Sequence, residues 1–142
     1  MSVAAILRGK PDRLIGLEES RSLAEAAQLL SRERIGALII RNRAGDMIGI
    51  LSERDIVRAI AKDGAAVIDR PVSSIMTKDV VCVTPEDDIA EVMSVMTERR
   101  FRHLPVKRGS SLIGMVSIGD VVKQRVEEAE VEAKQLREYI AS

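Results

Sequence analysis

Aromatic residues are almost missing from this chain of 142 residues, which has one Phe, one Tyr and no Trp. Proteins that bind single-stranded nucleic acid stack bases on aromatic side chains, so this class of protein is disfavoured. An excess of one charge is also missing, because 22 basic residues balance 22 acidic ones. We therefore expect no nucleic-acid partner.

Cysteine is nearly absent as well, and the single Cys82 excludes a disulfide within the chain. It lies in the apolar run VVCV with no obvious base beside it, which favours a buried structural thiol over a nucleophile. No apolar run approaches the roughly 20 residues that a membrane-spanning helix needs. The N-terminal MSVAAILRGK is too short for the apolar part of a secretory signal. These absences predict a reduced, cytoplasmic setting and no membrane partner.

What the sequence does contain is an internal repeat. The phrase IGILSERDIV at 48–57 returns as IGMVSIGDVV at 113–122, with Gly, Ser and Asp at the same spacing. The offset is 65 residues here and 66 residues earlier in the chain, so the turn between them differs by one residue. Identical pairs include Ala24/Ala90, Glu25/Glu91, Arg34/Arg100, Leu38/Leu104, Ile48/Ile113, Gly49/Gly114, Ser52/Ser117 and Asp55/Asp120. This pattern indicates a tandem duplication.

Each copy reads as β-α-β-β-α from its apolar periodicity and turn residues. The strands are expected at 14–17, 37–40 and 47–51, and at 80–83, 103–106 and 112–116, with the last helices at 56–62 and from 121 onward. We predict an α+β fold with a first repeat at 3–66, a linker at 67–78, a second repeat at 79–126 and a C-terminal helix at 127–142. One copy of about 50 residues buries little core alone, so the two copies are expected to pack together.

The repeated phrase has two interpretations. Ser52 and Ser117 are expected at helix N-termini, with Asp55 and Asp120 in the first turn, an arrangement that starts a helix well. The same place offers free N–H groups and a favourable dipole to an anion, and a carboxylate can accept two ribose hydroxyls. Helix capping alone does not explain why Gly and Asp recur in both copies while the turns diverge.

The residues resemble a known family. The duplicated Gly-Ser-Asp phrase, RFRHLPV at 100–106 and IMTKDVVCVTP at 75–85 are similar to a pair of CBS domains, also called a Bateman module, over about residues 3–125. The resemblance implies two β-α-β-β-α units packed about a pseudo-twofold axis, with two clefts between them. Such clefts hold AMP, ADP, ATP, NAD or S-adenosylmethionine. The Asp binds ribose, the Ser contacts phosphate or ribose, and basic residues meet phosphates.

Carried onto this sequence, the resemblance implies two unequal clefts. One would contain Ser117, Asp120, Arg102, His103, Gly16, Ile35 and Gly36. The other would contain Ser52, Arg54, Asp55, Cys82, Val83 and Phe101, with Arg102 as a further candidate. Gly16 and Cys82 stand where such modules often have Thr, so a hydroxyl contact is missing. We expect the Asp120 cleft to bind phosphate better because it collects more cations, with Arg54 compensating in the other cleft.

We interpret the chain as a regulatory sensor of an adenine nucleotide, AMP or ATP before NAD or S-adenosylmethionine. It would form a homodimer and act on an effector protein that the sequence does not name. The alternative is an interaction and dimerisation module with vestigial clefts. An enzyme acting on a nucleotide is disfavoured, since nothing in the sequence activates water or a nucleophile. His103, the only histidine, has no second ligand at metal spacing, so we expect neither a metal nor a catalytic cofactor.

The C-terminal segment repeats apolar residues at heptad-like spacing. Val122, Val126, Ala129, Ala133, Leu136 and Ile140 are spaced 4-3-4-3-4 in a segment without Gly or Pro. This seam either packs back on its own module or contacts a second chain.

Overall fold

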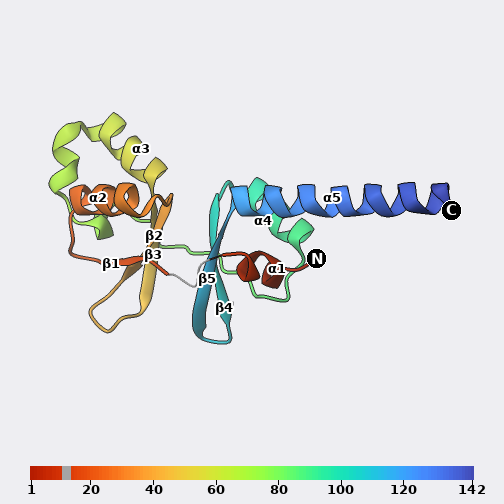
Figure 1. The fold of residues 1–142 in the computed structure, drawn as a ribbon. Coiled ribbons are helices and arrows are strands. Elements are labelled where there is room, and N and C mark those ends of the chain that lie inside the picture. The colour runs from red at the N-terminus through yellow and green to blue at the C-terminus, as the bar shows by residue number, and fades with distance from the viewer. Residues whose placement is uncertain (11–13) are drawn as a thin grey trace. The chain divides into compact units, whose positions relative to one another are not determined.

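The computed structural model describes residues 1–10 and 14–142 and divides the chain into two compact units (Figure 1). The first-repeat unit contains residues 14–80, and the second-repeat unit joins residues 1–10 to 81–142. Each unit thus holds one copy of the repeat. The expected first repeat began at residue 3, whereas helix α1, Val3–Arg8, belongs to the second-repeat unit.

The first-repeat unit is a three-stranded sheet with helices. Its elements are β1 (Gly16–Glu18), α2 (Leu23–Glu33), β2 (Ala37–Arg41), β3 (Met47–Ser52) and α3 (Glu53–Asp63), followed by the 3₁₀ turns η1 (Ala65–Asp69) and η2 (Val72–Ser74). Strand β2 is central, parallel to β1 and antiparallel to β3. Its core is built from aliphatic side chains, among them Leu23, Leu38 and Leu51, as the near absence of aromatic residues requires.

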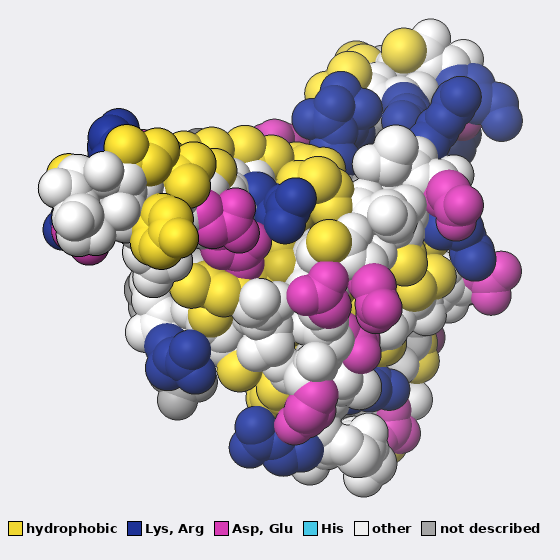
Figure 2. All heavy atoms as spheres, turned by 90° about the vertical axis from the view of Figure 1, so that its right-hand side faces the viewer, with side chains coloured by type: hydrophobic (Ala, Val, Ile, Leu, Met, Phe, Trp, Pro, Cys, Tyr) yellow, Lys and Arg dark blue, Asp and Glu magenta, His cyan; other side chains and the backbone are white. Residues whose placement is uncertain are grey.

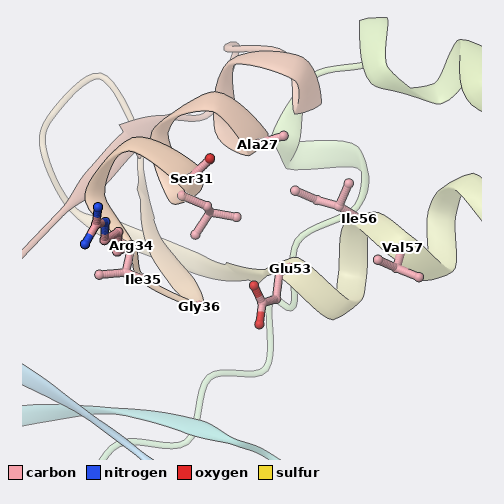
Figure 3. A pocket seen from close by; sticks show the side chains of 9 residues that line it. Ala27, Ser31, Arg34, Ile35, Gly36, Glu53, Ile56 and Val57 are labelled. Atoms are coloured by element: carbon pink, nitrogen blue, oxygen red, sulfur yellow. The ribbon is translucent and has the colours of Figure 1, made fainter.

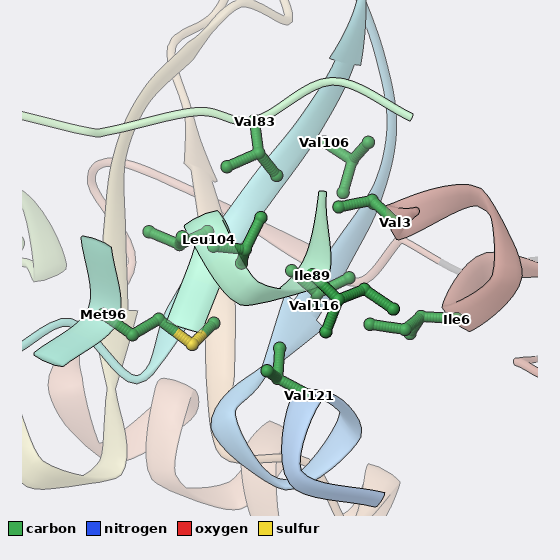
Figure 4. Packing of buried hydrophobic residues seen from close by; sticks show 10 residues of the cluster. Val3, Ile6, Val83, Ile89, Met96, Leu104, Val106, Val116 and Val121 are labelled. Carbon is green, nitrogen blue, oxygen red and sulfur yellow. The ribbon is translucent and has the colours of Figure 1, made fainter. Parts of the chain in front are cut away.

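The second-repeat unit contains α4 (Ile89–Arg99), β4 (His103–Arg108), β5 (Ser111–Ser117) and α5 (Ile118–Ala141), besides α1. Strands β4 and β5 form an antiparallel pair. Val3 and Ile6 of α1 enter the same core as Ile89, Val116 and Val121 from the other elements (Figure 4). Helix α5 is continuous, so the expected C-terminal helix at 127–142 is the extension of the last helix of the repeat.

The strand expected at 80–83 is the one element that does not form. In the first-repeat unit, the Ile39 N–H donates to the Ile15 carbonyl at 3.1 Å and joins the first strand to the central one. The residue that corresponds to Ile39 in the second copy is Pro105, which has no N–H to donate. Only an isolated parallel bridge between Val83 and Val106 remains. The shared apolar pattern predicted a strand that a single proline prevents.

The helix that opens each repeat begins at a side-chain cap and ends on a left-handed residue. Ser22 accepts a hydrogen bond from the Glu25 N–H at 3.1 Å, and Asp88 accepts one from the Ala90 N–H at 3.2 Å. Both helices end on an arginine, Arg34 or Arg100, in the left-handed conformation. The duplication therefore extends to the left-handed residue that ends each helix.

Candidate functional site

Each repeated phrase forms a capping box at the junction of a strand with a helix. The Asp55 N–H donates to Ser52 Oγ at 3.2 Å, and the Ser52 N–H donates to Asp55 Oδ2 at 2.8 Å. The corresponding distances for Ser117 and Asp120 are 3.1 Å and 2.9 Å. The capping interpretation is therefore confirmed in both copies. In both boxes the carboxylate uses Oδ2, and Oδ1 takes no part in the cap.

The second-repeat unit brings four predicted site residues to one end of the β4–β5 pair. His103 lies opposite Ser117 in the strand register. The Ile118 N–H donates to the Arg102 carbonyl at 2.8 Å, which ties the start of β4 to the start of α5. Arg102 is exposed, and His103, Ser117 and Asp120 are half-buried. Residues with a carboxylate, a hydroxyl, a guanidinium and an imidazole thus lie at the same end of this strand pair.

The same junction in the first-repeat unit carries less positive charge. Ala37 lies opposite Ser52, and the Glu53 N–H donates to the Gly36 carbonyl at 3.0 Å. Gly36 and Ala37 therefore occupy the places of Arg102 and His103. The exposed Arg54 follows in the first turn of α3 beside Asp55.

Lys10 is a residue of this region that the sequence analysis missed. Its Nζ lies 2.7 Å from Asp120 Oδ2 and 2.8 Å from the Met115 carbonyl oxygen. Both Lys10 and Asp120 belong to the second-repeat unit, where α1 delivers Lys10 to the sheet end. No motif marks Lys10, because its place follows from the packing of a six-residue helix.

The lysine changes the titration of the carboxylate. Burial by itself raises the pKa of Asp120, but the Lys10 ammonium and the Ser117 N–H outweigh it, and the pKa of Asp120 is lowered. Asp120 is therefore held as an anion with a cation already beside it.

The two junctions differ in what crosses the preceding strand. In the first-repeat unit the Ile50 carbonyl accepts a hydrogen bond from the Thr77 N–H at 2.8 Å. The corresponding carbonyl of the second copy, that of Met115, accepts instead from Lys10 Nζ. The linker thus covers one copy with backbone, whereas the N-terminal segment covers the other with a charged side chain. The two junctions therefore differ in what surrounds them, and the prediction of two unequal ligand sites stays a prediction.

The apolar residues predicted for the Asp55 site lie in or beside the core of the second-repeat unit. Val83 is 5% exposed, and its N–H and carbonyl bond to Pro105 and Lys107. Little of Val83 is left for a ligand. Phe101 packs partly against the same core, with the Arg99 guanidinium 5.9 Å from its ring centre. Cys82 is a free thiol and is only half-buried, whereas the sequence favoured a buried thiol.

The first-repeat unit has a hollow of about 570 Å³ between α2 and α3 (Figure 3). Side chains of Ala27 and Ser31 lie on one side, and those of Glu53 and Ile56 lie on the other. Ile35 and Gly36, which were predicted as ligand contacts, line this hollow. Gly16, also predicted, is exposed in β1.

Comparison with known proteins identifies the repeat. The sequence profile of the CBS domain matches residues 12–62 and 72–127. The chain belongs to the CBS-domain family. A mitochondrial CBS domain-containing protein of Arabidopsis thaliana is 37% identical over 120 residues, which are 82% of this chain and 58% of the relative. That relative therefore extends well beyond the part that this CBS-domain pair matches.

Solved structures confirm the α+β fold. A CBS-domain containing protein from Agrobacterium tumefaciens has a TM-score of 0.85 and 40% identity, with 87% of this chain and 92% of that chain covered. A CBS domain protein of Pyrobaculum aerophilum was solved with AMP (TM-score 0.73, 24% identity, 84% and 89% covered). The CBS-domain pair of another protein was solved with 5′-methylthioadenosine and S-adenosylmethionine (TM-score 0.77, 22% identity, 90% and 98% covered). The last two show the fold alone.

Across residues 1–10 and 14–142, none of the helices has the length and apolar character needed to cross a membrane. One relative is a mitochondrial protein, so the cytoplasmic location stays a prediction.

Proposed function

We propose that this CBS-domain pair is a regulatory module that binds an adenosine-containing nucleotide, AMP or ATP before ADP, NAD or S-adenosylmethionine. The observation that carries the proposal is the Asp120 carboxylate, fixed at a strand-to-helix junction with a cation on Oδ2. Structures of related fold that hold AMP and S-adenosylmethionine support the ligand class. We assign no reaction to the module, which acts by binding.

In this proposal the Asp120 carboxylate accepts hydrogen bonds from the ribose hydroxyls, and the Lys10 ammonium binds the phosphate. A ribose that binds both carboxylate oxygens competes with Lys10 for Oδ2, and a phosphate gives the released ammonium a new partner. Arg102 and His103, at the same sheet end, add cationic and hydrogen-bonding groups. An uncharged nucleoside would have to displace Lys10 without this compensation.

The remaining predicted contacts complete the proposal. Gly16, Ile35 and Gly36 would meet the base of the nucleotide bound at Asp120. Ser52, Arg54 and Asp55 would form the second and weaker phosphate site, with Cys82 and Phe101 beside it. A ligand shifts the equilibrium between two conformations of the module only by the difference in its affinity for the two conformations. An effector protein would then bind one of these conformations.

The phosphate-binding role proposed for Lys10 can be tested by substitution. Lys10→Met frees Asp120 for a ribose but removes a phosphate partner. The ratio of AMP affinity to adenosine affinity should therefore fall about tenfold, a change of about 1.4 kcal/mol. Calorimetric titration of both ligands measures it, and Lys123→Met, which alters an exposed lysine of α5, is the control. An unchanged ratio would overturn the role of Lys10.

The alternative, an interaction and dimerisation module with vestigial clefts, is favoured by one observation. Six large apolar side chains of α5 are exposed: Val122, Val126, Val131, Leu136, Tyr139 and Ile140. Mass spectrometry of small molecules released from the denatured, freshly purified protein separates the two functions. A co-purified adenosine compound supports the sensor, and clefts that stay empty at millimolar ligand support the alternative.

A further inference from the structure

Helix α5 extends far beyond the body that anchors it. Its 24 residues correspond to about 36 Å of helix. Its first turns contact α1, α4 and β5, and Val121 is fully buried among them. From residue 129 onward every side chain is exposed. The view from the side on which α5 ends shows a band of hydrophobic side chains with acidic and basic ones beside it (Figure 2).

The exposed apolar residues of α5 form a seam on one side of the helix. In heptad notation Val126, Ala133 and Ile140 take position a, and Val122, Ala129 and Leu136 take position d. All six are exposed, so the chain itself does not cover the seam. Val or Ile at a with Leu at d favours two-stranded coiled coils. The two alanines in the middle let two backbones approach closely.

The charges beside the seam match a second copy in parallel orientation. In a parallel pair each g position faces the e position five residues further along the partner. Arg125 would then face Glu130 of the partner subunit, and Glu132 would face Arg137 of the partner subunit, so both pairs have opposite charges. Arg125 also pairs with Glu128 in its own chain at 3.2 Å, and its five N–H donors can serve both carboxylates.

The antiparallel arrangement is disfavoured by the same residues. With Val126 facing Leu136 of the partner subunit, Glu130 would lie near the partner's Glu130, and Glu132 near the partner's Glu132. Lys123 would lie near the partner's Arg137. All three juxtapositions are repulsive, and like-charge contacts select against a pairing.

We propose that two copies of this chain associate through α5 as a parallel two-stranded coiled coil. The seam spans only about two and a half heptads, which is short for an isolated helix pair. Here the first turns of the helix are already packed in the second-repeat unit, so association does not carry the cost of starting the helix. The parallel orientation also places the two second-repeat units at the same end of the pair.

Engineered cysteines test the orientation. In a parallel pair each d residue faces itself, so Leu136→Cys should form a disulfide-linked dimer on mild oxidation. Val131→Cys, on the outer face of the same helix, should not exceed the background set by Cys82 in the unmodified chain. Linkage of Leu136→Cys only to Val126→Cys in a mixture would show an antiparallel pair and overturn the proposal. Equal linkage at 131 and 136 would overturn the seam itself.

A matched pair of valines tests the contribution of the seam. Val126 and Val131 are 51% and 49% exposed, so Val126→Glu and Val131→Glu change nearly equal surfaces. Val126→Glu should raise the dimer dissociation constant at least about tenfold, because a charge enters the seam. Val131→Glu should leave it within about twofold. Sedimentation of the ligand-free full chain measures both. Equal dissociation constants for the two variants would contradict the proposal, whatever the outcome for nucleotide binding.

Discussion

Two arginines adopt the left-handed backbone conformation, which glycine adopts more readily than any other residue. Arg34 and Arg100 end α2 and α4 with φ of 55° and 56°. A side chain in this left-handed region costs roughly 1–2 kcal/mol, and Gly avoids that cost. The same strained residue recurs in both copies at equivalent positions.

We therefore expect Arg34→Gly to stabilise the fold by about 0.5–1 kcal/mol. The gain is smaller than the strain because Gly makes the unfolded chain more flexible. Urea unfolding measures the free energy, and Arg32→Gly, inside the same helix, should instead destabilise by about 1 kcal/mol. A less stable Arg34→Gly variant would contradict the prediction.

The Asp120 carboxylate should make part of the stability depend on pH. Its pKa in the folded protein is lowered by Lys10 and the Ser117 N–H against the effect of burial. The stabilisation is complete above the unfolded value of about 3.9 and is lost as the pH falls through the lower folded value.

Asp120→Asn should accordingly cost about 1 kcal/mol at neutral pH. Its difference from the unmodified protein should shrink below about pH 4, and Lys10→Met should weaken this dependence. Unfolding free energies across the acid range measure the effect. A difference in unfolding free energy that is as large in acid as at neutral pH would contradict the prediction.

At the scale of elements, each sheet is crossed by a segment that packs on a glycine. A Cβ at Gly49 of β3 would lie 2.9 Å from the Thr77 carbonyl oxygen, which is backbone. A Cβ at Gly114 of β5 would lie 2.8 Å from Leu7 Cδ2, the end of a flexible side chain. Sequence reasoning places Gly where another backbone approaches closely, and the structure shows which segments approach.

The two glycines should differ in their tolerance of alanine. Gly49→Ala should cost about 1–3 kcal/mol because the linker backbone must move, whereas Gly114→Ala should cost less than about 1 kcal/mol. Chemical unfolding of the two variants provides the comparison. The reverse order would show that the linker yields more easily than Leu7.

Sequence periodicity predicted the helices of the two repeats, α2 to α5, and five of the six strands, because each buries one face and shows it as a repeat of apolar residues. It did not predict α1. It failed where one backbone N–H decides the outcome. Pro105 follows the apolar pattern of Ile39 but cannot donate the hydrogen bond that holds a first strand. The repeated Ser and Asp were placed correctly because capping depends on neighbouring residues.

At the scale of the whole molecule, the duplication predicted two units but not how the N-terminal segment is shared. Helix α1 follows no part of the repeat, yet it packs in the second-repeat unit and brings Lys10 to Asp120. Such a contact joins residues 110 positions apart, and no local pattern encodes it. The division between the repeats and the linker at 67–78 stays a prediction.

Titration calorimetry with AMP tests the central claim, nucleotide binding at Asp120, most directly. The dialysed full-length chain should bind AMP saturably, and Asp120→Asn should weaken the affinity at least about tenfold. Asp55→Asn, the matched change in the first repeat, should weaken it less. Absence of binding for AMP, ADP, ATP, NAD and S-adenosylmethionine at millimolar concentration would contradict the claim, as would equal affinities in all three proteins.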